Sequence, residues 1–83
     1  MTYEVHFSDT AYKQLKKLDK NIQIRIIDAL ERIKIRPESY ITKLIGDPGY
    51  RLRVGDYRVI MDIDKNKLVI LVIKIGHRKK IYK

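Results

Sequence analysis

Residues 50–62 read YRLRVGDYRVIMD, and this stretch decides the fold because two alternating apolar runs flank a glycine. Gly55-Asp56 fits a two-residue β-hairpin turn in which glycine takes a positive φ. That turn places Arg53 opposite Arg58, and directly opposed residues share one face of a sheet. A shift of one residue would turn the arginines into the core, so the pattern itself predicts this register.

Arg51 lies two residues before Arg53 and therefore joins Arg53 and Arg58 on one face, called here the arginine face. The apolar residues of the hairpin take the other face: Leu52, Val54, Tyr57, Val59 and Met61. Like charges that oppose one another on a sheet cost up to about 1 kcal/mol. A phosphate bound between them would make the interaction favourable, because each guanidinium group can donate two parallel hydrogen bonds to phosphate oxygens. The sequence predicts an anion site here; the alternative is arginines extended into water, pairing loosely with Asp62 or Glu4.

The size and composition of the chain predict one domain, residues 1–83, with a single core. There is no cysteine, which favours a reducing compartment and predicts a cytoplasmic protein. The opening residues MTYEVHF do not resemble a secretory signal. The longest apolar run, LVILVI at 68–73, is far shorter than the roughly 20 residues that a membrane-spanning helix requires. We therefore expect a soluble protein in which this run is a buried strand.

Positive charge is concentrated in the second half of the chain. The net charge is +9, from 19 Lys and Arg against 10 Asp and Glu. Residues 1–49 hold nine basic and seven acidic residues, and residues 50–83 hold ten and three, giving +2 and +7. Such a field favours a polyanionic partner such as nucleic acid, an acidic protein segment or an anionic membrane. The alternative is a basic protein with an ordinary solvated surface.

The first half of the chain predicts a strand followed by two helices. Residues 3–7 alternate apolar and polar side chains, as in a strand, and Ser8 can cap the helix that follows. The first helix has apolar residues at helical spacing, and the second has a longer stripe that Pro37 ends. These residues are Ala11, Leu15 and Leu18 in the first helix, and Ile22, Ile26, Leu30 and Ile33 in the second, widened by Ile27 and Ala29.

The rest of the chain predicts a loop at 36–49 and three strands joined by short turns, the second turn at Lys65-Asn66. Short connections imply antiparallel neighbours. The expected order is β-α-α-β-β-β, an α+β fold with an antiparallel sheet and a two-helix hairpin packed on one face. DNA reading by the second helix is not favoured, because its polar face has mixed signs typical of a solvated surface. That face carries Arg25, Asp28, Glu31 and Arg32.

The end of the chain adds candidates for chemistry. The last strand should return beside Tyr57 and Arg58, so that His77 and Arg78 reach the rim of the arginine face. Histidine is the side-chain type that moves a proton near neutral pH, and Tyr82 could stack on a base. No metal or cofactor site is indicated, since the chain has two histidines and neither a glycine-rich nucleotide loop nor a nucleophilic triad.

Two phrases, GDPGYRLRVGDYRVIMDI (46–63) and VIKIGHRKKIYK (72–83), resemble the RelE-type toxins of the RelE/ParE superfamily over essentially the whole chain. The resemblance implies a RelE-like fold and a ribosome-dependent endoribonuclease that cuts messenger RNA in the ribosomal A site. In that reaction the 2′-hydroxyl attacks the adjacent phosphate. It also implies a cognate acidic, RelB-like antitoxin as partner, and such a cationic body suits a segment that folds on contact.

The resemblance also implies roles for single residues. Arg51 and Arg53 match the basic pair that contacts the scissile phosphate, and Arg58 matches the transition-state stabiliser. Arg78 matches the residue proposed to protonate the leaving oxygen, and Tyr82 the base-stacking tyrosine. The neighbouring Lys79 and Lys80 are expected to bind RNA.

One departure from the family concerns the general base. The strand pair is lysine in well-known members, whereas arginine effectively never loses its proton. His77 is therefore the hypothesised general base or acid, the alternative being a positioning or RNA-contact role; His6 is expected to be an exposed strand residue. Two other functions stay open: a ParE-like toxin that inhibits DNA gyrase without cutting RNA, and an RNA- or ribosome-binding module with little or no cleavage.

Overall fold

The computed structural model describes residues 2–43 and 49–77. Its strands are β1 (Glu4–Phe7), β2 (Thr42–Lys43), β3 (Tyr50–Val54), β4 (Tyr57–Asp64) and β5 (Val69–His77). Its helices are α1 (Asp9–Lys16), α2 (Lys20–Ile33) and the short 3-10 helix η1 (Pro37–Ser39). The expected order of elements is confirmed, and η1 and β2 are additions within the segment that was expected to be a loop.

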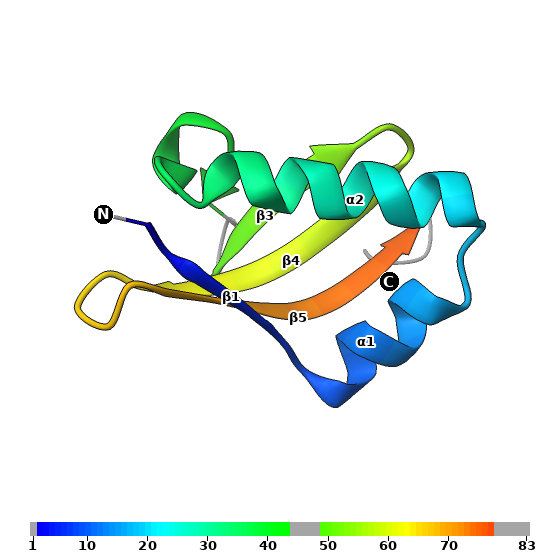
Figure 1. Ribbon diagram of the computed structural model, residues 1–83, viewed down its shortest axis with the longest axis horizontal. Helices are drawn as coiled ribbons and strands as arrows, with labels where there is room; N and C mark the ends of the chain where they lie inside the picture. The colour runs from blue at the N-terminus through cyan, green and yellow to red at the C-terminus, as the bar shows by residue number, and fades with distance from the viewer. Residues whose placement is uncertain (1, 44–48, 78–83) are drawn as a thin grey trace.

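The strands form one sheet in the order β1-β5-β4-β3-β2 (Figure 1). The pairs β2–β3, β3–β4 and β4–β5 are antiparallel, whereas β1 runs parallel to β5. The α+β class is confirmed, but the sheet is mixed and not antiparallel throughout. A tight turn dictates the direction only of the two strands that it joins. Because β1 is followed by two helices, its direction is free of that constraint.

The turn between β4 and β5 is longer than expected. It spans residues 65–68, four residues instead of the two at Lys65-Asn66. The Oδ1 atom of Asp64 accepts hydrogen bonds from the backbone N–H groups of Asn66 and Lys67, each at 3.0 Å. An aspartate that binds the backbone two residues onward forms a turn of its own, which favours the wider connection.

Helix α2 lies across one face of the sheet (Figure 1) and buries Ile26, Leu30 and Ile33. Ile27, which was expected to widen this stripe, is 40% exposed because each residue is rotated by about 100° from the one before it. In the described segments, no helix is long and apolar enough to cross a membrane. The buried core joins the helices to the sheet and contains Ala11, Leu15, Ile26, Leu30, Ile33, Leu52, Val54, Val59, Met61, Ile70, Val72 and Ile75.

Two polar side chains bind the backbone of β5 beside a bulge in that strand. The hydroxyl of Ser8, the N-cap residue of α1, donates to the carbonyl of Ile73 at 2.8 Å. The Oε1 atom of Gln14 accepts from the N–H of Ile75 at 2.7 Å. A bulge interrupts the ladder of strand hydrogen bonds. Helix α1 therefore supplies partners at the point where β5 changes its register against β4.

Replacing Gln14 with alanine is expected to lower the free energy of unfolding by about 1–3 kcal/mol, because the buried N–H of Ile75 loses its acceptor. Urea denaturation measures this change. The control is Lys13→Ala on the exposed side of the same helix, which should change stability by less than about 0.5 kcal/mol. Equal stabilities for the two variants would contradict a structural role for the Gln14 bond.

Candidate active site

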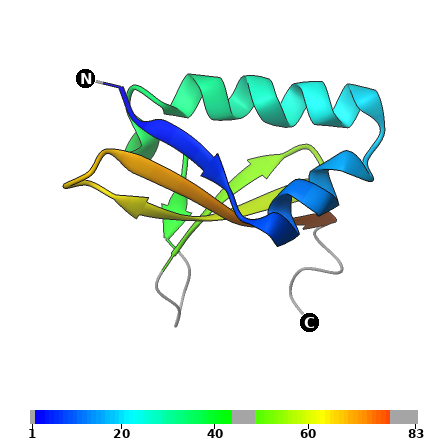
Figure 2. The ribbon, with the colours of Figure 1, turned by 60° about the horizontal axis from the view of Figure 1, so that its bottom comes forward.

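The β3–β4 hairpin has the register that the sequence predicted. Arg53 pairs with Arg58 around the turn Gly55-Asp56, where Gly55 adopts a φ of +60°. Arg51 pairs with Ile60 and so shares their face. Figure 2 shows α2 above the sheet, and the core residues of both helices pack on that same side. The arginine face is thus the side that no helix of the described segments covers.

The arginine face combines half-buried and exposed charge. Arg51 and Arg58 are half-buried, whereas Arg53 is exposed. On β5, Gly76 lies directly opposite Arg58, so no side chain occupies that position of the face. A half-buried guanidinium on the central part of a sheet loses little conformational freedom when it binds an anion. Arg58 is therefore the best-placed charge for a fixed oxyanion contact.

His77 lies on the other face of the sheet. It pairs with Tyr57, and the two rings meet edge to face with centroids 5.6 Å apart and an interplanar angle of 79°. The last strand does return beside Tyr57 and Arg58. His77 was expected to reach the rim of the arginine face, but its pairing with Tyr57 places it on the opposite face. The register shift between Ile60 and Met61 gives β5 one extra residue, which exchanges the faces of the residues that follow.

Arg53 is directed toward the hairpin turn. Its Nε atom donates to the carbonyl of Gly55 at 3.3 Å. Arg53 is also one of the residues that line a pocket of about 260 Å³ where α2 passes the turn. The other residues that line this pocket are Arg25, Asp28, Ala29, Arg32, Val54 and Gly55.

Arg25 and Arg32 were expected to belong to an ordinary solvated surface, and the structure places both of them with Arg53 around one pocket. The available signal was their spacing: residues seven apart lie on the same side of a helix. Their proximity to Arg53, which lies 28 residues after Arg25 and 21 after Arg32, could not be read from that spacing. Arg25 and Arg32 are therefore additions to the candidate functional residues.

The remaining candidates are distributed as follows. Arg78, Lys79, Lys80 and Tyr82 lie outside the described residues. His6 is exposed, as expected, and pairs with Glu4 at 2.8 Å. Asp62 accepts from the backbone N–H of Ile63 through Oδ1 at 3.0 Å. Within residues 2–43 and 49–77, no three His, Asp or Glu side chains are grouped so that they could hold a metal ion.

Comparison with known proteins identifies the family. A family model described as the ParE toxin of the type II toxin–antitoxin system parDE matches residues 5–82. A RelE-like toxin protein of Escherichia coli is 30% identical over 96% of this chain and 87% of its own length. The chain therefore belongs to the RelE/ParE superfamily of toxins.

Within that superfamily the similarity is to the RelE type. The mRNA interferase toxin RelE of Escherichia coli K12 is 28% identical, with 96% of this chain and 87% of the relative covered. The toxin–antitoxin complex RelBE2 of Mycobacterium tuberculosis matches with a TM-score of 0.86 and 25% identity, over 94% of this chain and 100% of that chain. The resemblance that the sequence indicated is confirmed.

Proposed function

We propose that this protein is the toxin of a type II toxin–antitoxin system and an endoribonuclease that cuts messenger RNA. The observation that carries the proposal is the direct pairing of Arg53 with Arg58 on the uncovered face, with Arg51 alongside. Opposed like charges disfavour folding slightly, and an RNA phosphate between them removes that cost. The similarity to an mRNA interferase supports RNA as the source of the phosphate.

The arginine face suits a reaction in which the 2′-hydroxyl of RNA attacks the adjacent phosphate. The bond from phosphorus to the 2′-oxygen forms and the bond to the 5′-oxygen breaks, leaving a cyclic phosphate and a 5′-hydroxyl. Negative charge grows on the phosphate oxygens in the transition state, where Arg58 would stabilise it. Arg51 and Arg53 would bind and orient the phosphate, which alone can supply several kcal/mol of rate enhancement.

Proton transfer is a separate requirement, since one proton leaves the 2′-hydroxyl and another joins the 5′-oxygen. Arginine is a poor base because it keeps its proton. His77 lies across the sheet from the arginine face, beside Tyr57. This placement favours water or a phosphate oxygen as the acceptor. By resemblance to the family, Arg78 is proposed to donate a hydrogen bond to the leaving 5′-oxygen, which takes its proton from water.

Replacing His77 with glutamine is accordingly expected to leave the single-turnover rate of RNA cleavage within about threefold, with an unchanged dependence on pH. The measurement is the rate from pH 5.5 to 8.5 on RNA engaged in translation. Glutamine keeps hydrogen-bonding capacity but cannot titrate. If the cleavage rate of the variant no longer rises or falls with pH where that of the unmodified protein does, His77 is the proton carrier.

The proposed partners are an acidic antitoxin, the ribosome and messenger RNA in the cytoplasm. The antitoxin proposal is supported by the RelBE2 complex of Mycobacterium tuberculosis and by a net charge of +9. Ribosome dependence is proposed on the basis of the resemblance to RelE-type toxins. A charge of this sign and size also favours approach to a polyanion such as the ribosome.

A cell-free translation reaction tests this function. Primer extension on the messenger should reveal cuts within codons that appear only when ribosomes translate it. The same reaction tests whether an antitoxin inhibits this protein: adding the product of the neighbouring gene should prevent the cuts. An intact messenger together with broken gyrase-bound DNA would instead assign the non-nucleolytic ParE-like function, which the family model keeps as the second candidate.

A further inference from the structure

The pocket beside the β3–β4 turn, called here the arginine pocket, brings together cations from two elements. Arg25 and Arg32 come from α2 and Arg53 from β3. One carboxylate, that of Asp28, lines the same pocket. Three arginines and one aspartate give the lining a formal charge of +2 around about 260 Å³, which is ample room for a phosphate group.

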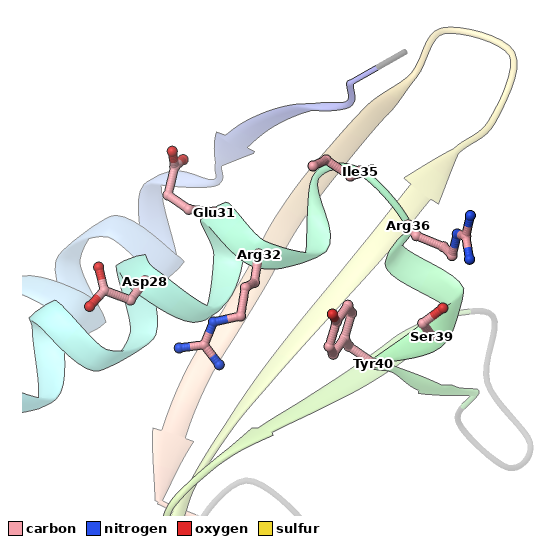
Figure 3. A pocket seen from close by; sticks show the side chains of 7 residues that line it. All are labelled: Asp28, Glu31, Arg32, Ile35, Arg36, Ser39 and Tyr40. Carbon is pink, nitrogen blue, oxygen red and sulfur yellow. The ribbon is translucent and has the colours of Figure 1, made fainter.

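The acids near this pocket do not neutralise it. Within residues 2–43 and 49–77 the ion pairs are Glu4 with His6 and Glu31 with Lys34, so Asp28 forms none with the pocket arginines. Figure 3 shows Glu31 and Arg32 leaving α2 in opposite directions. Arg32 also borders the neighbouring groove drawn in that figure, so its guanidinium is accessible from solvent on that side.

The turn holds two of the guanidinium groups close together. A Cβ atom built on Gly55 would lie 3.2 Å from Nη2 and 3.3 Å from Nη1 of Arg25, so this guanidinium rests against the turn. The Nε atom of Arg53 donates to the carbonyl of the same Gly55. Two like charges therefore meet at one glycine, an arrangement that an anion stabilises and that folding alone does not favour.

We propose that the arginine pocket is a second phosphate site, which binds an RNA phosphodiester next to the one held on the arginine face. Arg53 belongs to both sites, since it pairs with Arg58 across the hairpin and lines the pocket with Arg25 and Arg32. The pocket thus extends the RNA track around the edge of β3 toward α2. The inference rests on the proposed function, because it takes RNA as the ligand of the arginine face.

The experiment measures the affinity of the protein for a single-stranded 2′-O-methyl RNA decamer, which cannot be cut, at several salt concentrations. Each phosphate contact contributes a slope of about 0.7 to the plot of log affinity against log salt. The double variant R25A/R32A removes the contacts to one phosphate and should lower the slope by about 0.7. The matched control is K13A/K16A, which removes the same charge from the exposed side of α1 and should keep the slope of the unmodified protein.

A parallel titration with purified ribosomes separates two sources of the phosphate. A lowered slope with the decamer supports a phosphate of the substrate strand, and a lowered slope with ribosomes alone supports a phosphate of ribosomal RNA. Unchanged slopes in both, with melting temperatures equal to that of the unmodified protein, overturn the pocket even if the unmodified protein cuts messenger RNA. Weaker binding to an acidic peptide alone would overturn it in favour of a protein ligand. An unmodified protein that neither binds RNA nor cuts it overturns both proposals.

Discussion

Replacing Arg58 with alanine is expected to slow RNA cleavage by about 100- to 1,000-fold, the usual effect of removing one well-placed oxyanion donor. Arg58 is half-buried on the central strand β4, it faces Arg53, and the residue opposite it on β5 is Gly76. Its charge is therefore held where a phosphate on the arginine face would develop negative charge. The measurement is the single-turnover rate on messenger RNA engaged in translation.

The control for Arg58→Ala is Lys67→Ala in the turn between β4 and β5, at the other end of the hairpins. It removes the same charge from an exposed position, and the rate should stay within about threefold. Arg58→Lys is a further comparison, since lysine keeps the charge but lacks the planar fork that binds two phosphate oxygens. If Arg58→Ala folds and cuts at the unmodified rate, the arginine face is not the catalytic surface.

The register of the β3–β4 hairpin was predictable because one short turn and one alternating pattern both determine it. A shift of one residue would bury Arg53 and Arg58 and expose Val59, and the turn residues favour the same register, so the local and global preferences agree. The same reasoning could not reveal the parallel pairing of β1 with β5. That contact joins Glu4 to Val69 and depends on where the helices lead the chain.

The bulge in β5 explains why the placement of His77 was not predictable. The run from Val69 to Ile75 is apolar at nearly every position, so it gives no alternation from which to read the faces. Ser8 and Gln14 bind the backbone of β5 beside the bulge, and their hydrogen bonds span more than 60 residues. Lys74 was one available signal. A charged side chain is expected on the uncovered face, and because side chains alternate along a strand, Ile75 and His77 then lie on the covered face.

The arginine pocket, too, could not be predicted from the sequence, because its residues meet only through tertiary packing. The charges of Arg25 and Arg32 were evident, but only the packing of α2 over the β3–β4 turn makes them neighbours of Arg53. Arg53 was expected to lie opposite Arg58 on the arginine face. Arg53 lies near the end of β3, and its Nε atom donates to the carbonyl of Gly55 in the turn. A long side chain at a strand end can therefore contact groups outside the sheet face on which it lies.

Replacing Ile26 with alanine is expected to cost about 2–5 kcal/mol of folding stability, a large part of the total for a domain of this size. Ile26 is fully buried where α2 packs on the sheet, so the truncation leaves a cavity that a small core closes only in part. Each kcal/mol corresponds to roughly 4–8 °C in melting temperature for such a domain. Thermal unfolding followed by circular dichroism measures the change.

The adjacent Ile27 provides the matched control, because Ile27→Ala removes the same atoms one position along the same helix. Ile27 is 40% exposed, so its truncation should cost less than about 1 kcal/mol. Both changes have the same effect on helix propensity, and the difference between the two variants therefore measures burial alone. Equal losses would mean that α2 is rotated about its axis from the orientation described. Such a rotation would also move Arg25 and Arg32 away from the β3–β4 turn, so this stability comparison constrains the arginine pocket independently of any RNA measurement.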